Sequence, residues 1–230
     1  MPNLVSRENW LSQRLKLLEK EKNFTRDRDA LSHARRDLPM VEITTPYRFA
    51  TVEGEKSLPD LFADKEQLLV YHFMYGPEWE SGCPSCSFFV DNFEGIETHL
   101  AARNTALVLA SNAPLATLEA YRARMGWTIP WVSALNTSFG EDFGVSFPTQ
   151  ADMDGNSYNY GKKPYAGESP GLSVFYKLND GRVAHSYSTY GRGLDILNGA
   201  YNLLDLTPNG RDEADLPYAQ AWVRRHDEYA

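Results

Sequence analysis

The sequence QLLVYHFMY, residues Gln67–Tyr75, is nearly continuous in apolar and aromatic residues. This composition predicts a strand that is buried on both faces, as in the centre of a parallel sheet. A loop over Gly76–Gly82 follows it, and Cys83–Leu100 then shows the three- and four-residue apolar spacing of a helix. We therefore predict a strand–loop–helix unit with two cysteines, Cys83 and Cys86, at the start of the helix.

Two further apolar runs extend this unit. Ala106–Ala110 and Trp131–Leu135 are predicted strands, and a helix over Pro114–Met125 lies between them. Asn179-Asp180-Gly181 joins two later strands into a β-hairpin, and a helix over Leu194–Leu206 ends the pattern. Strands joined by helices require right-handed parallel crossovers, whereas the hairpin adds antiparallel strands. The predicted order resembles an α/β, thioredoxin-like fold of three layers with a mixed central sheet.

Two parts of the chain flank this core. Residues 1–40 predict an N-terminal helical arm with a helix over Ser6–Lys22, a break at Asn23-Phe24, and a second helix that begins at Thr25 and is ended by Pro39. Residues 41–206 are the predicted thioredoxin-like domain, which includes a long ordered loop over residues 151–168. We expect residues 207–230 to form a tail packed on the domain, with a final helix around residues 218–225.

Composition and charge limit what the chain can bind. The sequence has 230 residues, of which 42% are hydrophobic, so it can bury a sizeable core. The net charge is −8, and residues 1–40 hold nine basic and six acidic side chains, so the remainder is strongly acidic. An acidic body argues against a nucleic-acid partner. Since no apolar run reaches the ~18 residues of a membrane span, and the first residues lack a signal-peptide core, we expect a cytoplasmic protein with no membrane partner.

The cysteine pair is the strongest candidate site. In a cytoplasmic protein, two close cysteines favour redox or metal chemistry over a structural disulfide. Unpaired N–H groups at a helix start stabilise a thiolate, and Pro84 suits the first turn because it has no N–H. We assign Cys83 as the attacking thiolate and Cys86 as the resolving thiol.

Two other interpretations of the pair stay open at this point. The cysteines are then either packed without chemistry or part of a metal site completed by histidines. A four-cysteine zinc site is excluded because the chain has only two cysteines. His72 lies inside the predicted buried strand, where a hydrogen-bonded core histidine is the simpler explanation. We predict no metal and no cofactor.

A second feature is Ser169-Pro170-Gly171, just before the predicted strand that begins at Leu172. In thioredoxin-like folds a cis-proline occupies this place and faces the cysteine pair, so the resemblance implies that Pro170 is cis and shapes a groove for the substrate. An ordinary trans proline at the start of a strand is the alternative. The residues that we expect to bind substrate are Trp79, Pro84, Ser85 and Ser169. A wider aromatic set is also a candidate for the wall of a cleft, although packing explains it as well: Trp79, Trp127, Trp131, Tyr158, Tyr160 and Tyr165.

Several motifs resemble a bacterial family of thioredoxin-like proteins known as domain of unknown function 899 (DUF899). The resemblance covers nearly the whole chain and implies the thioredoxin-like fold, but the family label implies no particular reaction. The motifs are Tyr71–Trp79, Gly82–Ser87, Arg124–Trp127, Pro170–Tyr176 and Tyr187–Tyr190.

A more distant resemblance is to peroxiredoxins, in Leu58–Phe62, Ile129–Trp131 and Phe143–Val145. The catalytic motif departs from that pattern. Peroxiredoxins place a threonine or serine three residues before the peroxidatic cysteine, where this sequence has Glu80, and Pro77 is one residue too close to Cys83. A carboxylate beside Cys83 would raise the pKa of the thiol, which weakens the peroxidase interpretation.

The leading hypothesis from the sequence is a thiol–disulfide oxidoreductase that acts on a protein or a small-molecule thiol or disulfide. Cys83, Cys86 and Pro170 are its predicted catalytic residues. A thiol peroxidase with Cys83 as the peroxidatic residue is the first alternative. A non-catalytic binding module that uses the same fold is the second. A homodimer through the N-terminal arm is a further expectation, from the thin apolar stripe of its first helix.

Overall fold

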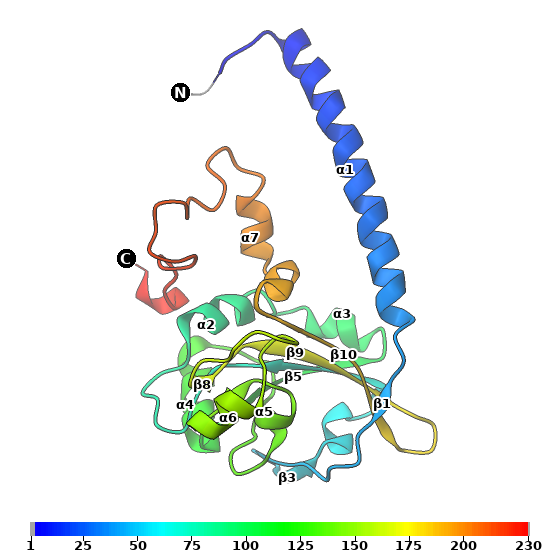
Figure 1. The fold of residues 1–230 in the computed structure, drawn as a ribbon, viewed down its shortest axis with the longest axis vertical. Helices are drawn as coiled ribbons and strands as arrows, with labels where there is room; N and C mark the ends of the chain where they lie inside the picture. The colour runs from blue at the N-terminus through cyan, green and yellow to red at the C-terminus, as the bar shows by residue number, and fades with distance from the viewer. Residues whose placement is uncertain (1–2, 230) are drawn as a thin grey trace. The chain divides into compact units, whose positions relative to one another are not determined.

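The computed structural model describes residues 3–229, and the chain divides into two units, Met1–Pro39 and Met40–Ala230. The first unit contains one continuous helix, α1 (Arg7–Arg36), in which no side chain is buried (Figure 1). Ser6 caps α1 by accepting a hydrogen bond from the N–H of Asn9, 3.2 Å away. No helix within the described residues is long and apolar enough to span a membrane.

The predicted break in this helix at Asn23-Phe24 is wrong. Asn and Phe disfavour a helix by only a few tenths of a kcal/mol to ~0.7 kcal/mol each, whereas a new helix requires a costly nucleus. Thr25 accordingly lies inside α1, where its hydroxyl donates to the carbonyl of Glu21 instead of capping a second helix.

A mixed sheet of eight strands forms the centre of the second unit within the described residues (Figure 1). The strand order is β1-β10-β9-β4-β5-β6-β2-β3, in which β4, β5 and β6 are parallel and the other neighbours antiparallel. Strands β7 and β8 form a separate antiparallel pair. The strands span Val41–Glu42 (β1), Arg48–Thr51 (β2), Gly54–Ser57 (β3), Gln67–His72 (β4), Thr105–Ser111 (β5), Trp131–Ser133 (β6), Ser146–Phe147 (β7), Gly167–Glu168 (β8), Gly171–Lys177 (β9) and Val183–Tyr190 (β10).

Helices cover both faces of this sheet, because alternate side chains of the central strands point to opposite faces. On one face Tyr71 of β4 packs in a cluster with side chains of α2 and α4. On the other face Val70 packs with side chains of η1 and α5. The helical segments are η1 (Pro59–Phe62), α2 (Pro84–Val90), α3 (Glu97–Ala101), α4 (Leu115–Met125), α5 (Phe139–Asp142), α6 (Gln150–Gly155), η2 (Gly191–Leu197), α7 (Gly199–Leu204) and η3 (His226–Glu228), where η marks a 3-10 helix.

This architecture confirms the predicted fold class, an α/β, thioredoxin-like fold with a mixed central sheet and an N-terminal helix. The predicted helix over Cys83–Leu100 is wrong in extent, because α2 ends at Val90 and α3 begins at Glu97. Between them Asn92 turns its side-chain amide onto the carbonyl of Phe88. Gly95 then adopts φ +84°, a left-handed conformation that ends a regular helix.

Other differences lie in the second half of the chain. The loop predicted over residues 151–168 contains most of α6, which Thr149 and Asp152 start with a reciprocal capping box. The helix predicted over Leu194–Leu206 is divided into η2 and α7, because Asn198 ends the first and caps the second. Residues 218–225 form no helix, so the final helix predicted there is wrong. The short η3 begins directly after this segment.

Candidate functional site

The cysteine pair lies at the junction between the loop after β4 and helix α2, as the sequence predicts. Cys83 is the N-cap residue of α2 and Pro84 is its first residue, where the missing N–H costs no hydrogen bond. The N–H of Cys83 donates to the carbonyl of Met74, 3.2 Å away, which ties the end of the loop to its beginning. Glycine is required at position 82, directly before Cys83, because a Cβ there would lie 2.8 Å from the ring of Phe73.

The two thiols are free and have different environments. Cys86 is buried, at 1% exposure, whereas Cys83 is partly exposed. A hydrogen bond from the Cys86 thiol lowers the pKa of Cys83 from 9.0 to about 7, and the N–H groups of Cys86 and Ser85 and the charge of Arg225 act in the same direction against the effect of burial. Burial, followed by the hydrogen bond to Cys83 and the charge of Cys83, raises the pKa of Cys86 well above its ordinary value.

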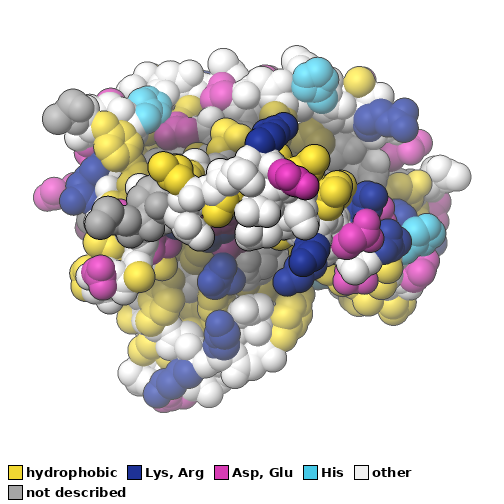
Figure 2. Space-filling model, turned by 90° about the horizontal axis from the view of Figure 1, so that it is seen from above, with side chains coloured by type: hydrophobic (Ala, Val, Ile, Leu, Met, Phe, Trp, Pro, Cys, Tyr) yellow, Lys and Arg dark blue, Asp and Glu magenta, His cyan; other side chains and the backbone are white. Residues whose placement is uncertain are grey.

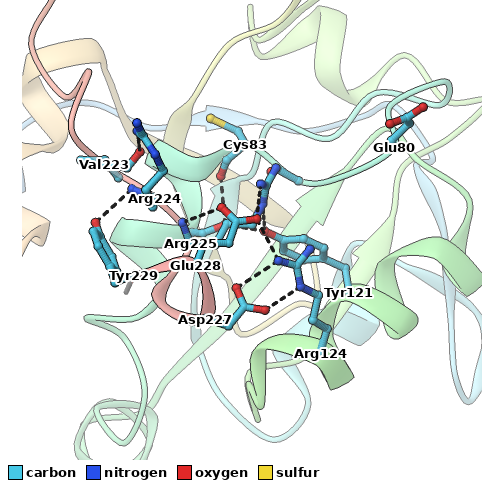
Figure 3. A network of polar contacts seen from close by, with 12 residues as sticks. Glu80, Cys83, Tyr121, Arg124, Val223, Arg224, Arg225, Asp227, Glu228 and Tyr229 are labelled. Carbon is cyan, nitrogen blue, oxygen red and sulfur yellow. Dashed lines mark hydrogen bonds and ion pairs between the residues drawn. The ribbon is translucent and has the colours of Figure 1, made fainter.

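Arg225, from the C-terminal tail, holds the loop before Cys83. Its Nη2 and Nε donate to the carbonyl of Gly82, at 2.7 and 3.2 Å, and Nε also donates to the hydroxyl of Tyr121 at 2.8 Å (Figure 3). The Tyr121 hydroxyl is 2.9 Å from the Ser87 hydroxyl, which in turn donates to the carbonyl of Cys83. A continuous chain of hydrogen bonds therefore joins the tail to the start of α2.

The tail segment around Arg225 is anchored by charge as well. Arg124 of α4 forms two hydrogen bonds with the carboxylate of Asp227, at 2.7 and 3.0 Å, and a third with Glu228 at 2.9 Å (Figure 3). Glu228 also pairs with Arg225 at 2.8 Å. The sequence gives no local signal for this role of Arg225, because Gly82 and Tyr121 lie more than a hundred residues away from it in the chain.

Glu80 does not lie against the thiol, so this part of the sequence interpretation is wrong. Its side chain is exposed and lies apart from Cys83 in Figure 3. It is also not among the groups that change the pKa of Cys83, whereas the cationic Arg225 is. The loop is held by the hydroxyl of Tyr75, which donates to the backbone carbonyl of Glu80 and leaves the carboxylate free to face solvent.

A cavity of about 280 Å³ adjoins the buried cysteine. Its walls come from α2, the turn at Pro170, η2, α7 and the C-terminal tail. Pro170 and Ser85 line it together with Cys86, so the structure brings these three predicted site residues together. The other lining residues are Tyr71, Met74, Phe89, Gly191, Arg192, Leu194, Asp195, Tyr201, Arg211, Glu213, Ala219 and Gln220.

The predicted cis bond at Pro170 is wrong, because the described residues contain no cis peptide bond. The extended chain here is fixed on both sides of the bond. The N–H of Ser169 donates to the carbonyl of Val145, and the carbonyl of Pro170 accepts from the hydroxyl of Tyr158. A trans proline at the start of β9 satisfies both contacts without the cost of the cis form.

Two predicted substrate-binding residues lie away from this cavity. Ser169 is buried and lines a different, small cavity on the His72 and Glu168 side of the sheet. Trp79 is partly exposed in the loop before Cys83, with its ring over Gly76, and it does not line the cavity at Cys86. Pro84 is in the first turn of α2 and fixes the backbone between the two cysteines.

The proposed aromatic cleft is also not present in the predicted form. Trp127 and Trp131 are buried in the core, at 4% and 3% exposure. The tyrosines that do line the cavity at Cys86 are Tyr71 and Tyr201. Tyr71 could have been predicted from the sequence, because it lies in the strand just before the cysteine loop. Tyr201 could not, because only the packing of α7 brings it to the cavity.

The metal interpretation finds no support in the part of the chain that the structure describes, where no group of three or more His, Cys, Asp or Glu side chains could hold an ion. His72 is instead a hydrogen-bonded core residue, with its Nε2 2.8 Å from the hydroxyl of Ser173. Burial lowers the pKa of His72 to about 3, so the ring is neutral.

Comparison with known proteins places the chain in a family. The model of a family described as "Bacterial protein of unknown function (DUF899)" matches residues 1–229. The chain belongs to the DUF899 family. No curated protein sequence matches it.

Solved structures similar to this DUF899 protein include peroxiredoxins. Peroxidoxin BcpB from Mycobacterium tuberculosis has a TM-score of 0.48 at 13% identity, over 67% of this chain and 85% of that one. Peroxiredoxin Q from Xanthomonas campestris has a TM-score of 0.46 at 14% identity, over 70% and 94%. A mutant of PrxQ from Xylella fastidiosa has a TM-score of 0.45 at 14% identity, over 71% and 96%. Since these likenesses are distant, the reaction has to be inferred from the cysteine site itself.

Proposed function

We propose that this DUF899 protein is a thiol–disulfide oxidoreductase that uses Cys83 and Cys86. The observation that supports this most is the contrast between the two thiols. A partly exposed thiol with a lowered pKa stands beside a buried thiol with a raised pKa. An attacking group has to be ionised and reachable, whereas a resolving group can stay protonated until the mixed disulfide has formed.

The reaction follows from these two roles. The Cys83 thiolate attacks one sulfur of a substrate disulfide, so that a Cys83–substrate disulfide forms and one substrate thiolate leaves. The Cys86 thiol then loses its proton and attacks the Cys83 sulfur. The new Cys83–Cys86 disulfide releases the second substrate thiol. The two protons of the cysteines end on the two product thiols, and the protein is oxidised as the substrate is reduced.

The test is whether the pair cycles between dithiol and disulfide. We would oxidise the protein with a small excess of an acyclic disulfide, such as bis(2-hydroxyethyl) disulfide, and map the product by mass spectrometry. A loss of two hydrogens located to the Cys83–Cys86 peptide is expected. The Cys86→Ser variant should instead accumulate a mixed disulfide on Cys83, because the resolving thiol is absent. If the pair stays reduced and Cys83 titrates like an ordinary thiol, the proposed function is refuted. The remaining interpretation is then a non-catalytic binding module.

A second candidate, thiol peroxidase, is favoured by one observation. The positive charge near Cys83 comes from Arg225, and the Glu80 carboxylate that counted against a peroxidatic thiolate faces away. In that reaction Cys83 becomes a sulfenic acid, which Cys86 condenses to the disulfide with loss of water. Stopped-flow mixing with hydrogen peroxide separates the two functions. Sulfenic acid formation that is faster than exchange with disulfides would favour the peroxidase.

A further inference from the structure

The cavity beside Cys86 suggests which kind of disulfide the site accepts. Cys86 forms part of its wall, and Cys83 is the N-cap residue of the same helix, α2, so the cavity adjoins the cysteine pair on the Cys86 side. Its volume of about 280 Å³ is below the ~300–1,000 Å³ of pockets for drug-sized ligands. A group that enters this cavity is therefore small.

The tail closes one side of the cavity. Arg211, Glu213, Ala219 and Gln220 belong to its lining, and they are held in place by contacts inside the same unit. Glu213 accepts hydrogen bonds from the hydroxyl of Tyr201 at 2.6 Å, from the indole of Trp222 at 2.8 Å and from the N–H of Gln220 at 2.9 Å. A folded protein substrate can reach the partly exposed Cys83 but would have to displace this segment to fill the cavity, whereas a small molecule would not.

Both arginines of the lining are paired with carboxylates, whereas Glu213 accepts hydrogen bonds from neutral donors. Asp195 forms ion pairs with both Arg192 and Arg211, each at 2.9 Å, and Arg211 pairs in addition with Asp205 at 2.8 Å. The guanidinium of Arg211 also lies 3.9 Å from the ring centre of Tyr201. Figure 2 shows one face of the molecule, on which acidic and basic side chains are interspersed among hydrophobic ones. An anionic ligand would therefore find no unpaired arginine among these residues and would meet the carboxylate of Glu213.

The uncharged part of the lining is mainly apolar, and it includes a buried hydroxyl that lacks a hydrogen-bond partner. Met74, Phe89 and Leu194 present hydrocarbon and thioether surface, which favours an apolar ligand. The hydroxyl of Tyr71 is buried without a hydrogen-bond partner of ordinary geometry, and the neighbour that affects its pKa most is Cys86. A buried hydroxyl of this kind gains free energy when a ligand supplies the missing hydrogen bond.

We propose that this cavity binds the organic group of an uncharged, low-molecular-weight disulfide, so that the DUF899 protein acts on small-molecule rather than protein disulfides. The inference rests on the proposed function, whose exchange steps it leaves unchanged. The small disulfide is the oxidant, and its two sulfurs leave as two thiols. The cavity holds its apolar group, and Tyr71 hydrogen-bonds to its polar atom.

Three disulfides of different size and charge test the proposal on the full chain. The reduced protein would be mixed in single turnover with bis(2-hydroxyethyl) disulfide, with glutathione disulfide and with insulin, and the Cys83–Cys86 disulfide quantified with time. We expect the uncharged small disulfide to react at least about tenfold faster than glutathione disulfide, a difference of about 1.4 kcal/mol. Equal or faster reaction with either of the other two would overturn the inference and leave the proposed function intact.

A pair of variants tests the cavity itself. Ala219→Trp places a large side chain at an exposed position of the wall, and Ala214→Trp makes the same change in the tail outside the lining. Ala219→Trp should slow the small disulfide at least about fivefold, or roughly 1 kcal/mol, with an unchanged Cys83 pKa, and Ala214→Trp should not. An equal rate in the wild type and both variants would refute binding of the disulfide in this cavity. Failure of every disulfide to oxidise the pair would refute both the inference and the proposed function.

Discussion

Replacing Cys86 by alanine tests how Cys83 becomes acidic. The hydrogen bond from the Cys86 thiol is the largest of the effects that lower the Cys83 pKa to about 7, ahead of two backbone N–H groups and Arg225. Cys86→Ala removes this donor and keeps most of the burial, which opposes ionisation. We therefore expect the pKa of Cys83 to rise to about 9 or above, the range of an unperturbed or buried thiol.

The expected change in reactivity follows from the ionised fraction. At pH 7 a thiol with a pKa near 7 is roughly half ionised, and one with a pKa near 9 about 1% ionised, a ratio of about 50. The more basic thiolate is intrinsically more nucleophilic, by about eightfold over two pKa units. Alkylation of Cys83 by iodoacetamide should therefore slow only about sixfold at pH 7 and should reach a plateau about eightfold higher at alkaline pH.

The assay is the alkylation rate of Cys83 between pH 5 and pH 11, with Cys86→Ser as the matched control. Serine keeps an O–H donor at this position, so its Cys83 pKa should stay between those of the wild type and Cys86→Ala. A Cys86→Ala midpoint within about half a pKa unit of the wild type would refute the reasoning, since the backbone and Arg225 would then suffice to lower the pKa.

Three further predictions concern the surroundings of the pair. Arg225→Gln should raise the Cys83 pKa by less than Cys86→Ala does, because Arg225 makes the smallest of the named contributions to that pKa. The variant should also speed trypsin cleavage of the tail, which loses its hydrogen bond to Gly82. An unchanged digestion rate would contradict the anchoring role of Arg225. Gly82→Ala should lower the free energy of unfolding in urea by about 1–3 kcal/mol, since its Cβ would lie 2.8 Å from the ring of Phe73 and 3.0 Å from that of Tyr121. His72 has a folded-state pKa of about 3 against 6.5 when unfolded, so its contribution to stability is complete above pH 6.5 and is lost as the pH falls toward 3. Between about pH 6 and pH 4 the free energy of unfolding should fall by about 1.4 kcal/mol per pH unit because of this residue. The His72→Asn variant, which cannot bind the proton, should lack that part of the slope.

Much of the fold was predictable because its signals are local. The first six residues of the run QLLVYHFMY form β4, which ends at His72, three residues before the predicted end. The Asn179-Asp180-Gly181 turn joins β9 to β10. The helix boundaries that were wrong after Cys83 and after Leu194 depend on single residues. Asn92 and Gly95 divide the helix after Cys83, and Asn198 ends η2 and starts α7. Hydrophobic periodicity cannot predict such contacts, because it records which face of a helix is apolar and not where the helix stops.

The candidate site was predictable only in its central part. The spacing of Cys83 and Cys86 and the position of Pro84 place the pair at a helix start, and Pro170 does line the cavity with Cys86. The trans bond at Pro170 and the position of Ser169 in another cavity were not predictable. Both depend on Val145 and Tyr158, which fix the chain from other parts of the sequence.

The sequence by itself therefore determined the central strands with the helices between them, the fold class and the position of the cysteine pair, since each depends on residues that are neighbours along the chain. The tertiary structure decided the chemical character of that pair. Arg225 reaches the loop before Cys83 from 143 positions further along the chain, and Arg124 holds the tail in place from α4. The tail and α7 also close the cavity beside Cys86. Burial, charge and hydrogen bonding at a thiol depend on distances in space, and these set the pKa of each cysteine only after the chain has folded.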